Sequence, residues 1–178
     1  MSKLLIIDDE RGIRNTLREI LADEGHEVDV AENGKQGLEM AQAKAYDLIF
    51  SDIKMPEMDG LEFLMKLKNA ENDENGDATL NGECPVVMIS GHGDVETAVQ
   101  ALKNGAYDFL LKPLDLNRIL ITTKNALESK SLKQETRQLR KKISAKGPQM
   151  IGESAAIQRV REIIDKVAPT EVRCSWTR

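Results

Sequence analysis

This sequence of 178 residues contains few aromatic residues and has no excess of basic over acidic residues. Phenylalanine, tryptophan and tyrosine together make up 3%, which leaves few rings on which nucleic-acid bases could stack. The formal net charge is −5, whereas a domain that binds nucleic acid is expected to be basic. The composition therefore argues against a general nucleic-acid-binding protein.

Cysteine and histidine occur only twice each. Cys84 and Cys174 are far apart and form no C-x-x-C pair, so we expect two reduced thiols. His26 and His92 have no second ligand three or four residues away. The sequence thus offers no cysteine or histidine metal site.

Long apolar runs are missing as well. None approaches the ~20 residues that a helix needs to span a bilayer. The first apolar run ends at Asp8, which makes it too short for the core of a signal peptide. We therefore expect a protein of the cytoplasm.

Short apolar runs alternate with segments of helical periodicity along the first two thirds of the chain. Such an alternation is typical of an α/β fold, a doubly wound five-stranded parallel sheet with helices on both faces. A polar segment at 71–84 is expected to be a loop. The predicted strands are 3–7, 26–30, 47–51, 85–90 and 107–111, and the predicted helices are 11–24, 34–44, 60–70, 94–104 and one from 114 onward.

Acidic and other polar residues stand where the predicted strands end. Asp8 and Asp9 follow the first strand, Asp52 follows the third, Ser90 ends the fourth and Lys112 follows the fifth. The carboxyl ends of parallel strands meet at one edge of the sheet, where ligands bind. Three carboxylates at one place repel one another, and a hard cation such as Mg²⁺ relieves that repulsion. Each acid taken alone is better explained as a helix cap or as part of a solvated loop.

This combination of groups suits phosphoryl transfer. A carboxylate can attack phosphorus and form an acyl phosphate. The reaction depends on positive charge around the phosphoryl oxygens, which a metal ion and Lys112 would supply. The Ser90 hydroxyl can donate a hydrogen bond to a phosphoryl oxygen.

Four motifs together resemble the receiver domain of two-component response regulators, over roughly residues 3–125. They are D-D at 8–9, D-I-K-M-P-x-M-D-G at 52–60, S-G-H at 90–92 and K-P at 112–113. The resemblance implies a flavodoxin-like receiver fold, a signalling role rather than that of a metabolic enzyme, and a sensor histidine kinase as partner. It implies that Asp52 is the phosphoacceptor. The Mg²⁺ ligands would be Asp8, Asp9, Asp52 and the backbone carbonyl of Lys54.

The same resemblance assigns further roles. Lys112 contacts the phosphoryl group, and the bond between Lys112 and Pro113 is cis. Ser90 and Phe109 form a switch pair in which the hydroxyl moves toward the phosphate and the ring turns inward behind it. Ser90 stands where threonine is frequent, and Phe109 where tyrosine is frequent. Output passes through the surface of the fourth helix, fifth strand and fifth helix.

Two other classes of protein share part of this pattern. Phosphatases of the haloacid-dehalogenase type usually carry a second acid two residues after the nucleophile, but that position is Lys54 here. A flavin-binding flavodoxin-like protein needs a phosphate-binding loop after its first strand. Asp8, Asp9 and Glu10 would repel a phosphate there.

The fifth helix is predicted to continue beyond the receiver domain (1–125) as a linker over 126–147. Leu132, Thr136, Leu139 and Ile143 alternate at spacings of four and three residues, which is typical of a short coiled coil. This seam predicts a homodimer through the linker helix. A solvated single helix is the alternative.

The last part, 148–178, resembles the start of the AAA+ domain of NtrC-like, sigma-54-dependent activators. The G-E-S at 152–154 and V-A-P-T-E at 167–171 carry that resemblance, which implies that a full-length protein binds sigma-54 RNA polymerase and enhancer DNA. No phosphate-binding G-x-x-x-x-G-K-[ST] motif follows, so neither partner nor ATP is expected to bind this chain. The closing C-S-W-T-R does not match the family's next strand and is expected to be a cloning remnant.

Overall fold

The computed structural model describes residues 1–69, 83–91 and 95–145, with side chains described up to residue 140. Two compact units, Met1–Glu135 and Thr136–Arg178, divide the chain, and every described strand belongs to the first. Residues 71–82 of the predicted loop at 71–84, His92, Asp94 and the whole of 148–178 lie outside the described residues. The elements are β1 (Lys3–Ile7), α1 (Arg11–Asp23), β2 (Glu27–Ala31), α2 (Gly34–Ala43), β3 (Leu48–Asp52), α3 (Gly60–Asn69), β4 (Val86–Ser90), α4 (Val95–Lys103), β5 (Asp108–Leu111) and α5 (Leu116–Ala145).

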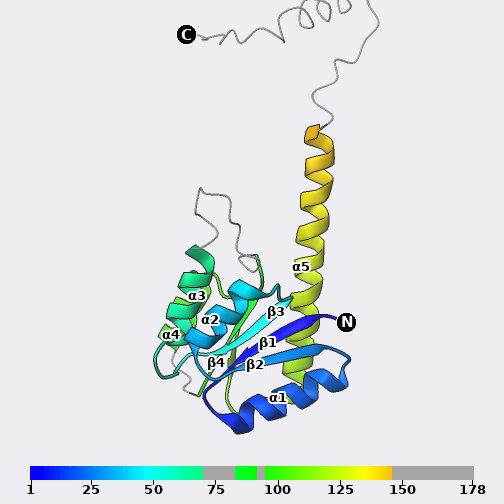
Figure 1. Cartoon of the computed structure of the whole chain (residues 1–178). Coiled ribbons are helices and arrows are strands. Elements are labelled where there is room, and N and C mark those ends of the chain that lie inside the picture. Colours follow the sequence, from blue (N-terminus) through cyan, green and yellow to red (C-terminus); the bar gives the residue numbers. More distant parts are fainter. Residues whose placement is uncertain (70–82, 92–94, 146–178) are drawn as a thin grey trace, which may run out of the picture. The chain divides into compact units, whose positions relative to one another are not determined.

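The strands form the predicted five-stranded sheet in the order β2-β1-β3-β4-β5, and every neighbouring pair is parallel (Figure 1). The direction in which successive strands are added reverses between β1 and β3. In α/β sheets the ligand-binding crevice lies at the carboxyl ends of the two strands at such a point. Their side chains are buried almost throughout, as expected of strands covered on both faces. The predicted fold class is confirmed.

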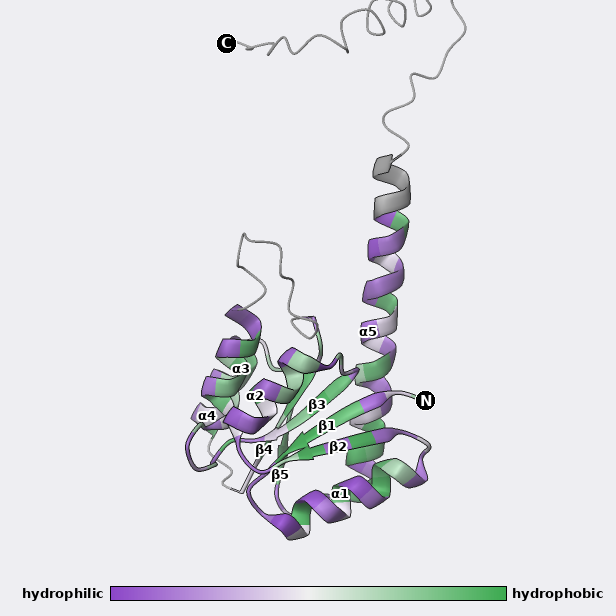
Figure 2. Ribbon diagram, viewed as in Figure 1, coloured by the Kyte–Doolittle hydropathy of each residue, from purple (hydrophilic) through white to green (hydrophobic). Residues whose placement is uncertain are grey.

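Alternate residues of each strand face two separate apolar cores, because successive side chains of a strand point to opposite faces. Leu4 and Ile6 pack with α1 and α5, whereas Leu5 and Ile7 pack with α2, α3 and α4. Figure 2 shows the strands mostly in the hydrophobic colour and the helices in both colours. The helices thus form one layer on each face of the sheet. No helix of the described part is long and apolar enough to cross a membrane.

Strands β2, β3, β4 and β5 each begin one residue later than predicted, and the helices before β2 and β5 end in a left-handed turn. Gly25 has a φ of +83°; its N–H donates to the Ala22 carbonyl, and the next N–H donates to the Leu21 carbonyl. Gly105, with a φ of +92°, ends α4 with the same pair of bonds. The N–H of His26, where β2 was predicted to begin, is thus used in closing α1, which delays that strand.

Strand β3 also ends one residue later than predicted and therefore includes Asp52. Asp52 pairs with Ile89 of β4, and the next N–H, that of Ile53, donates to the Ile89 carbonyl at 2.9 Å. Pairing with β4 continues to the end of β3, so Asp52 sits in regular strand geometry. The nucleophile candidate is therefore held by the sheet and not by a loop.

Helix α5 packs against the rest of the first unit beyond residue 125, the predicted boundary. Ala126 is fully buried, and the Lys130 ammonium donates to the Tyr46 carbonyl at 2.7 Å and to Asp47 at 2.9 Å. A receiver fragment that keeps these contacts has to extend past Lys130. The division between receiver and linker stays a prediction.

Gly60, the first residue of α3, lies where even an added methyl group should destabilise the fold. A Cβ at this position would overlap the backbone carbonyl of Asp52 and approach the Met88 methyl to 2.8 Å. We expect Gly60→Ala to lower the free energy of unfolding by about 2–3 kcal/mol, measured in urea. Gly12→Ala is the control, because a Cβ there meets nothing within 4 Å and alanine favours α1 by about 0.5–1 kcal/mol. Equal stability of Gly60→Ala and wild type would contradict this packing.

Candidate functional site

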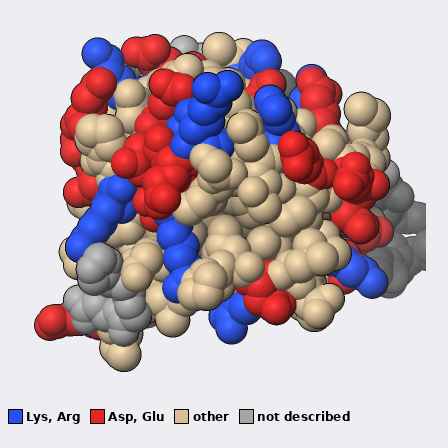
Figure 3. Space-filling view, turned by 90° about the horizontal axis from the view of Figure 1, so that it is seen from below, with Lys and Arg blue, Asp and Glu red and all other residues tan. Residues whose placement is uncertain are grey.

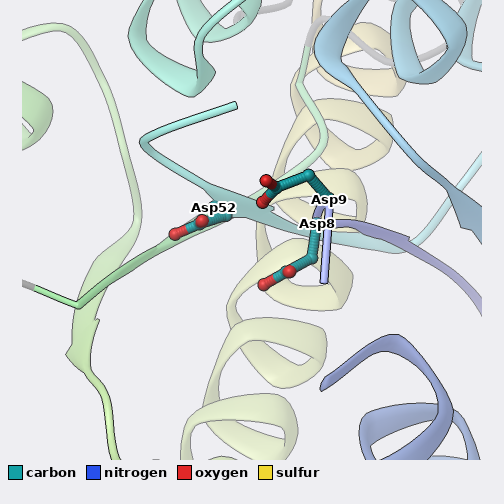
Figure 4. Close-up of side chains that lie close together, drawn as sticks. All are labelled: Asp8, Asp9 and Asp52. Carbon is teal, nitrogen blue, oxygen red and sulfur yellow. The ribbon is translucent and has the colours of Figure 1, made fainter. Parts of the chain in front are cut away.

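The structure brings the three predicted acids together at one edge of the sheet. Asp8 and Asp9 follow β1, and Asp52 ends the neighbouring β3. One carboxylate oxygen from each lies within 4.8 Å of those of the other two. Asp8 and Asp52 are buried, whereas Asp9 is exposed. Figure 4 shows the three carboxyl groups on the same side of the strand ends.

Lys112 directly follows β5, the edge strand, and its side chain reaches two of these acids. Its ammonium nitrogen lies 3.1 Å from Asp8 Oδ2 and 3.3 Å from Asp52 Oδ2. The backbone N–H of Lys112 donates to the Ser90 carbonyl at 2.7 Å, and this bond holds the turn after β5 beside the end of β4. The peptide bond between Lys112 and Pro113 is cis, as the resemblance implied.

Glu10 is a fourth acid, which the sequence analysis named beside Asp8 and Asp9 but did not assign to the site. Its Oε1 lies 3.0 Å from the Lys112 ammonium, although its side chain is 60% exposed. It immediately follows Asp8 and Asp9 and stands at the N-cap of α1, without a side-chain capping bond. That position next to two site acids was the only signal in the sequence, and acids before a helix are common for other reasons.

One lysine does not compensate the buried acids. Burial raises the pKa of Asp8, even though a backbone N–H and Lys112 favour its charged form. Burial also raises the pKa of Asp52, where the charge of Asp8 adds to the effect and Lys112 opposes it. Burial alone would lower the pKa of Lys112, but Glu10, Asp8 and Asp52 together raise it. The site therefore holds an excess of negative charge.

One buried oxygen, Asp8 Oδ2, has the Lys112 ammonium 3.1 Å away but no hydrogen bond of good geometry from the described residues. Asp8 Oδ1 accepts a hydrogen bond from the Glu10 N–H at 2.8 Å, but Asp8 Oδ2 receives none of good geometry from the described residues. Buried polar atoms are seldom left in this state. A hard cation would bind Asp8 Oδ2 and would also offset the excess negative charge of the acids. The residues therefore fit a divalent metal ion.

A cleft of about 660 Å³ opens beside the acids. It lies between the loop after β3 and the start of α4, and it is large enough for a phosphoryl group and water molecules. Figure 3 shows acidic and basic side chains close together on the face seen from below, with no extended basic area. The lining residues are Asp9, Ile53, Lys54, Met55, Pro56, Asp59, Leu61, Ser90 and Thr97.

Three other predicted site residues occupy different surroundings. Ser90 is buried at the end of β4 and lines the cleft. Lys54 lines it too, in the loop after Asp52. Phe109 lies further from the edge, because it pairs with Met88, two residues before Ser90, and packs half-buried on the core beneath α4. The roles of Ser90 and Phe109 as a switch stay a prediction.

The site agrees with the family to which the sequence is similar. Residues 4–124 match the response regulator receiver domain. The nitrogen assimilation regulatory protein NtrX of Azorhizobium caulinodans is 40% identical over 172 residues, which are 96% of this chain and 35% of that protein. The C4-dicarboxylate transport transcriptional regulatory protein DctD of Pseudomonas aeruginosa is 37% identical over 171 residues, with 94% and 35% covered. The chain thus spans about a third of the length of these curated relatives.

Solved structures show the same similarity. The receiver domain of NtrX from Brucella abortus is 40% identical with a TM-score of 0.62, over 70% of this chain and 98% of that one. A CheY-like receiver domain protein from Methanospirillum hungatei is 28% identical with a TM-score of 0.65, over 75% of this chain and 98% of that one. With acids, lysine and sheet arranged as described, the chain belongs to the response regulator receiver domain family.

Proposed function

We propose that Asp52 accepts a phosphoryl group from a histidine of a sensor kinase, with Mg²⁺ bound by Asp8, Asp9, Asp52 and the backbone carbonyl of Lys54. The observation that carries the proposal is the group of three carboxylates at the ends of β1 and β3, two of which, those of Asp8 and Asp52, lie within 3.3 Å of the Lys112 ammonium. In such a site a divalent metal ion would offset the charge of the acids, and the metal ion and Lys112 together would offset that of a phosphoryl group.

The chain's own residues account for the parts of the reaction. A carboxylate oxygen of Asp52 forms a bond to phosphorus while the bond from phosphorus to the histidine nitrogen breaks, and the product is an acyl phosphate. Lys112, 3.3 Å from Asp52, is placed to stabilise the charge on the phosphoryl oxygens. Ser90 supplies a hydroxyl from the wall of the cleft. Bound Mg²⁺ would supply further positive charge to the same oxygens.

The signal would leave the site through Ser90 and Phe109. The Ser90 hydroxyl would turn toward the phosphoryl group, and the half-buried Phe109 ring would move into the space behind it. That movement would change the surface formed by α4, β5 and α5. Transfer of the signal, and not turnover of a substrate, would be the role of the domain in the cytoplasm.

Intact mass after incubation with acetyl phosphate tests this proposal. We expect one added phosphoryl group that requires Mg²⁺, no addition after chelation, and none on Asp52→Asn. Asp59→Asn is the matched control, because Asp59 lines the same cleft from an exposed position. A phosphorylated Asp52→Asn, or an unreactive wild type, would overturn the assignment.

We further propose that the linker at 126–147 joins two copies of the chain. Leu132 and Leu139, at the predicted seam of α5, are 64% and 52% exposed. Two such leucines on a charged helix are more stable when a second helix covers them.

Sedimentation of a double variant tests the dimer. We expect the wild type to be a dimer and Leu132→Asp with Leu139→Asp to be a monomer that is still folded, because a charge in the seam opposes helix pairing. Leu116→Asp is the control, since Leu116 is similarly exposed at 50% but lies outside the seam. A wild type that stays monomeric at high concentration would refute the dimer.

The third proposal concerns a longer protein of which this chain is one part. We propose that it is a sigma-54-dependent activator that contacts RNA polymerase and enhancer DNA through regions beyond this chain. The resemblance of residues 148–178 to the start of an AAA+ domain supports this, as do relatives named as transcriptional regulatory proteins. An ATPase assay on a protein that carries this chain together with a complete AAA+ domain would test it, and no ATPase activity there would contradict it.

A further inference from the structure

A buried arginine lies directly behind the acidic site. Arg14, on the first turn of α1, is 6% exposed. Its Nη1 donates to the backbone carbonyl of Asp8 at 2.7 Å and to that of Asp9 at 2.9 Å. One guanidinium nitrogen therefore holds the main chain of both residues that carry the first two metal-binding carboxylates.

The other end of the guanidinium is anchored to a second turn. Nη2 donates to Glu32 Oε1 at 2.8 Å, just after β2. The Glu32 N–H in turn donates to the Gln36 side chain at 2.8 Å, in the first turn of α2. Arg14 thus connects the turn after β1 to the start of α2.

Stability alone is a weak explanation for this arrangement. Burial of a guanidinium is unfavourable unless its partners compensate fully. The charged partner, Glu32, has a side chain that is 71% exposed, and exposed ion pairs contribute little. The two bonds to the carbonyls are the well-buried part of the arrangement. What they fix is the direction in which Asp8 and Asp9 leave the end of β1.

We propose that Arg14 is the positioning residue of the metal site: it holds the Asp8 and Asp9 carbonyls so that both carboxylates present their oxygens to one ion. The inference rests on the proposed Mg²⁺ site. Only arginine supplies several rigidly oriented donors, so a lysine at this position keeps the charge but does not bind both carbonyls and Glu32 together. Groups that orient metal ligands typically contribute 10–100-fold in metal affinity.

The proposal is testable because positioning and electrostatic repulsion predict opposite changes in Mg²⁺ affinity when Arg14 is replaced. A cation close to the acids repels Mg²⁺, so its removal should strengthen Mg²⁺ binding if charge were all that mattered. Loss of positioning should weaken binding instead. Arg14→Lys keeps the charge and isolates the geometry, whereas Arg14→Met removes both.

The experiment is calorimetric titration of Mg²⁺ into the full chain, with thermal unfolding of the metal-free proteins alongside. We expect Arg14→Lys and Arg14→Met to bind Mg²⁺ roughly 10–100-fold more weakly than wild type. Arg18→Lys and Arg18→Met are matched controls, because Arg18 is exposed one turn further along α1 and should leave the affinity unchanged. In the acetyl phosphate reaction, the half-saturating Mg²⁺ concentration should rise by the same factor for Arg14→Lys, while the rate at saturating Mg²⁺ stays near that of wild type.

Each result decides the proposal. Arg14 variants that are folded and bind Mg²⁺ as tightly as wild type, or more tightly, would overturn it. If Arg14→Met does not fold, Arg14→Lys decides alone. A lower unfolding temperature of Arg14→Lys with unchanged Mg²⁺ affinity would assign Arg14 to stability only. A wild type that binds no Mg²⁺ would overturn the proposed metal site as well, so the wild-type titration separates the two failures.

Discussion

Replacement of Asp8 by asparagine is expected to raise the unfolding temperature in metal-free buffer at neutral pH and to weaken Mg²⁺ binding at least roughly 100-fold. The Asp8 side chain is fully buried, and one of its oxygens receives no hydrogen bond of good geometry from the described residues. Asparagine keeps the oxygen that accepts from the Glu10 N–H but removes the buried charge. Each kcal/mol gained should raise the unfolding temperature by about 2–4 °C.

The dependence of this gain on pH provides the control. The pKa of Asp8 is raised in the folded protein above the ordinary value of 3.8. Between these two values the folded state binds more protons than the unfolded state, so wild-type stability falls as the pH rises. Asparagine does not titrate, so its advantage should be present at neutral pH and disappear below the ordinary value. An asparagine variant less stable than wild type at neutral pH would contradict the excess of negative charge.

Replacement of Lys112 by methionine is expected to have the opposite effect on stability. Its ammonium compensates Asp8 and Asp52, whose side chains are 0% and 7% exposed. Loss of one partner of a buried ion pair typically costs about 3–5 kcal/mol, which urea unfolding in metal-free buffer would measure. Added Mg²⁺ should restore much of this loss because it binds only the folded state. The rate of phosphorylation at saturating Mg²⁺ should nevertheless fall roughly 100-fold or more.

Lys54→Met is the matched control for Lys112→Met. Lys54 lines the same cleft, but its side chain is exposed and is expected to contribute little to stability. If both lysine variants were equally stable, Lys112 would not be the compensating charge. If Lys112→Met were phosphorylated at the wild-type rate, Lys112 would have no role in stabilising the phosphoryl group.

The sequence was sufficient to predict the sheet and its acidic edge. The strand Leu48–Asp52 is buried throughout because both faces are covered, and its apolar start, Leu48–Phe50, is visible in the sequence alone. The sequence itself places Asp8, Asp52 and Lys112 at the carboxyl ends of predicted strands. The rule that strand ends meet at one edge then places them together.

The contacts of Glu10 and Arg14 were not predictable in this way. Glu10 reaches Lys112, 102 residues away in sequence, because the turn after β1 aims it across the site. Arg14 reaches the carbonyls of Asp8 and Asp9 only because α1 folds back over the end of β1. Both depend on the path of a turn. Sequence periodicity gives the existence of a helix and carries no information on that path.

The central claim is that Asp52 is the residue that becomes phosphorylated, and reduction of the trapped product tests it most directly. Borohydride converts an acyl phosphate to an alcohol, so aspartyl phosphate becomes homoserine. After phosphorylation with acetyl phosphate and Mg²⁺, reduction and peptide mass mapping, we predict homoserine at position 52 and at no other aspartate. Homoserine at position 8, 9 or 59, or a product that resists reduction, would contradict the claim.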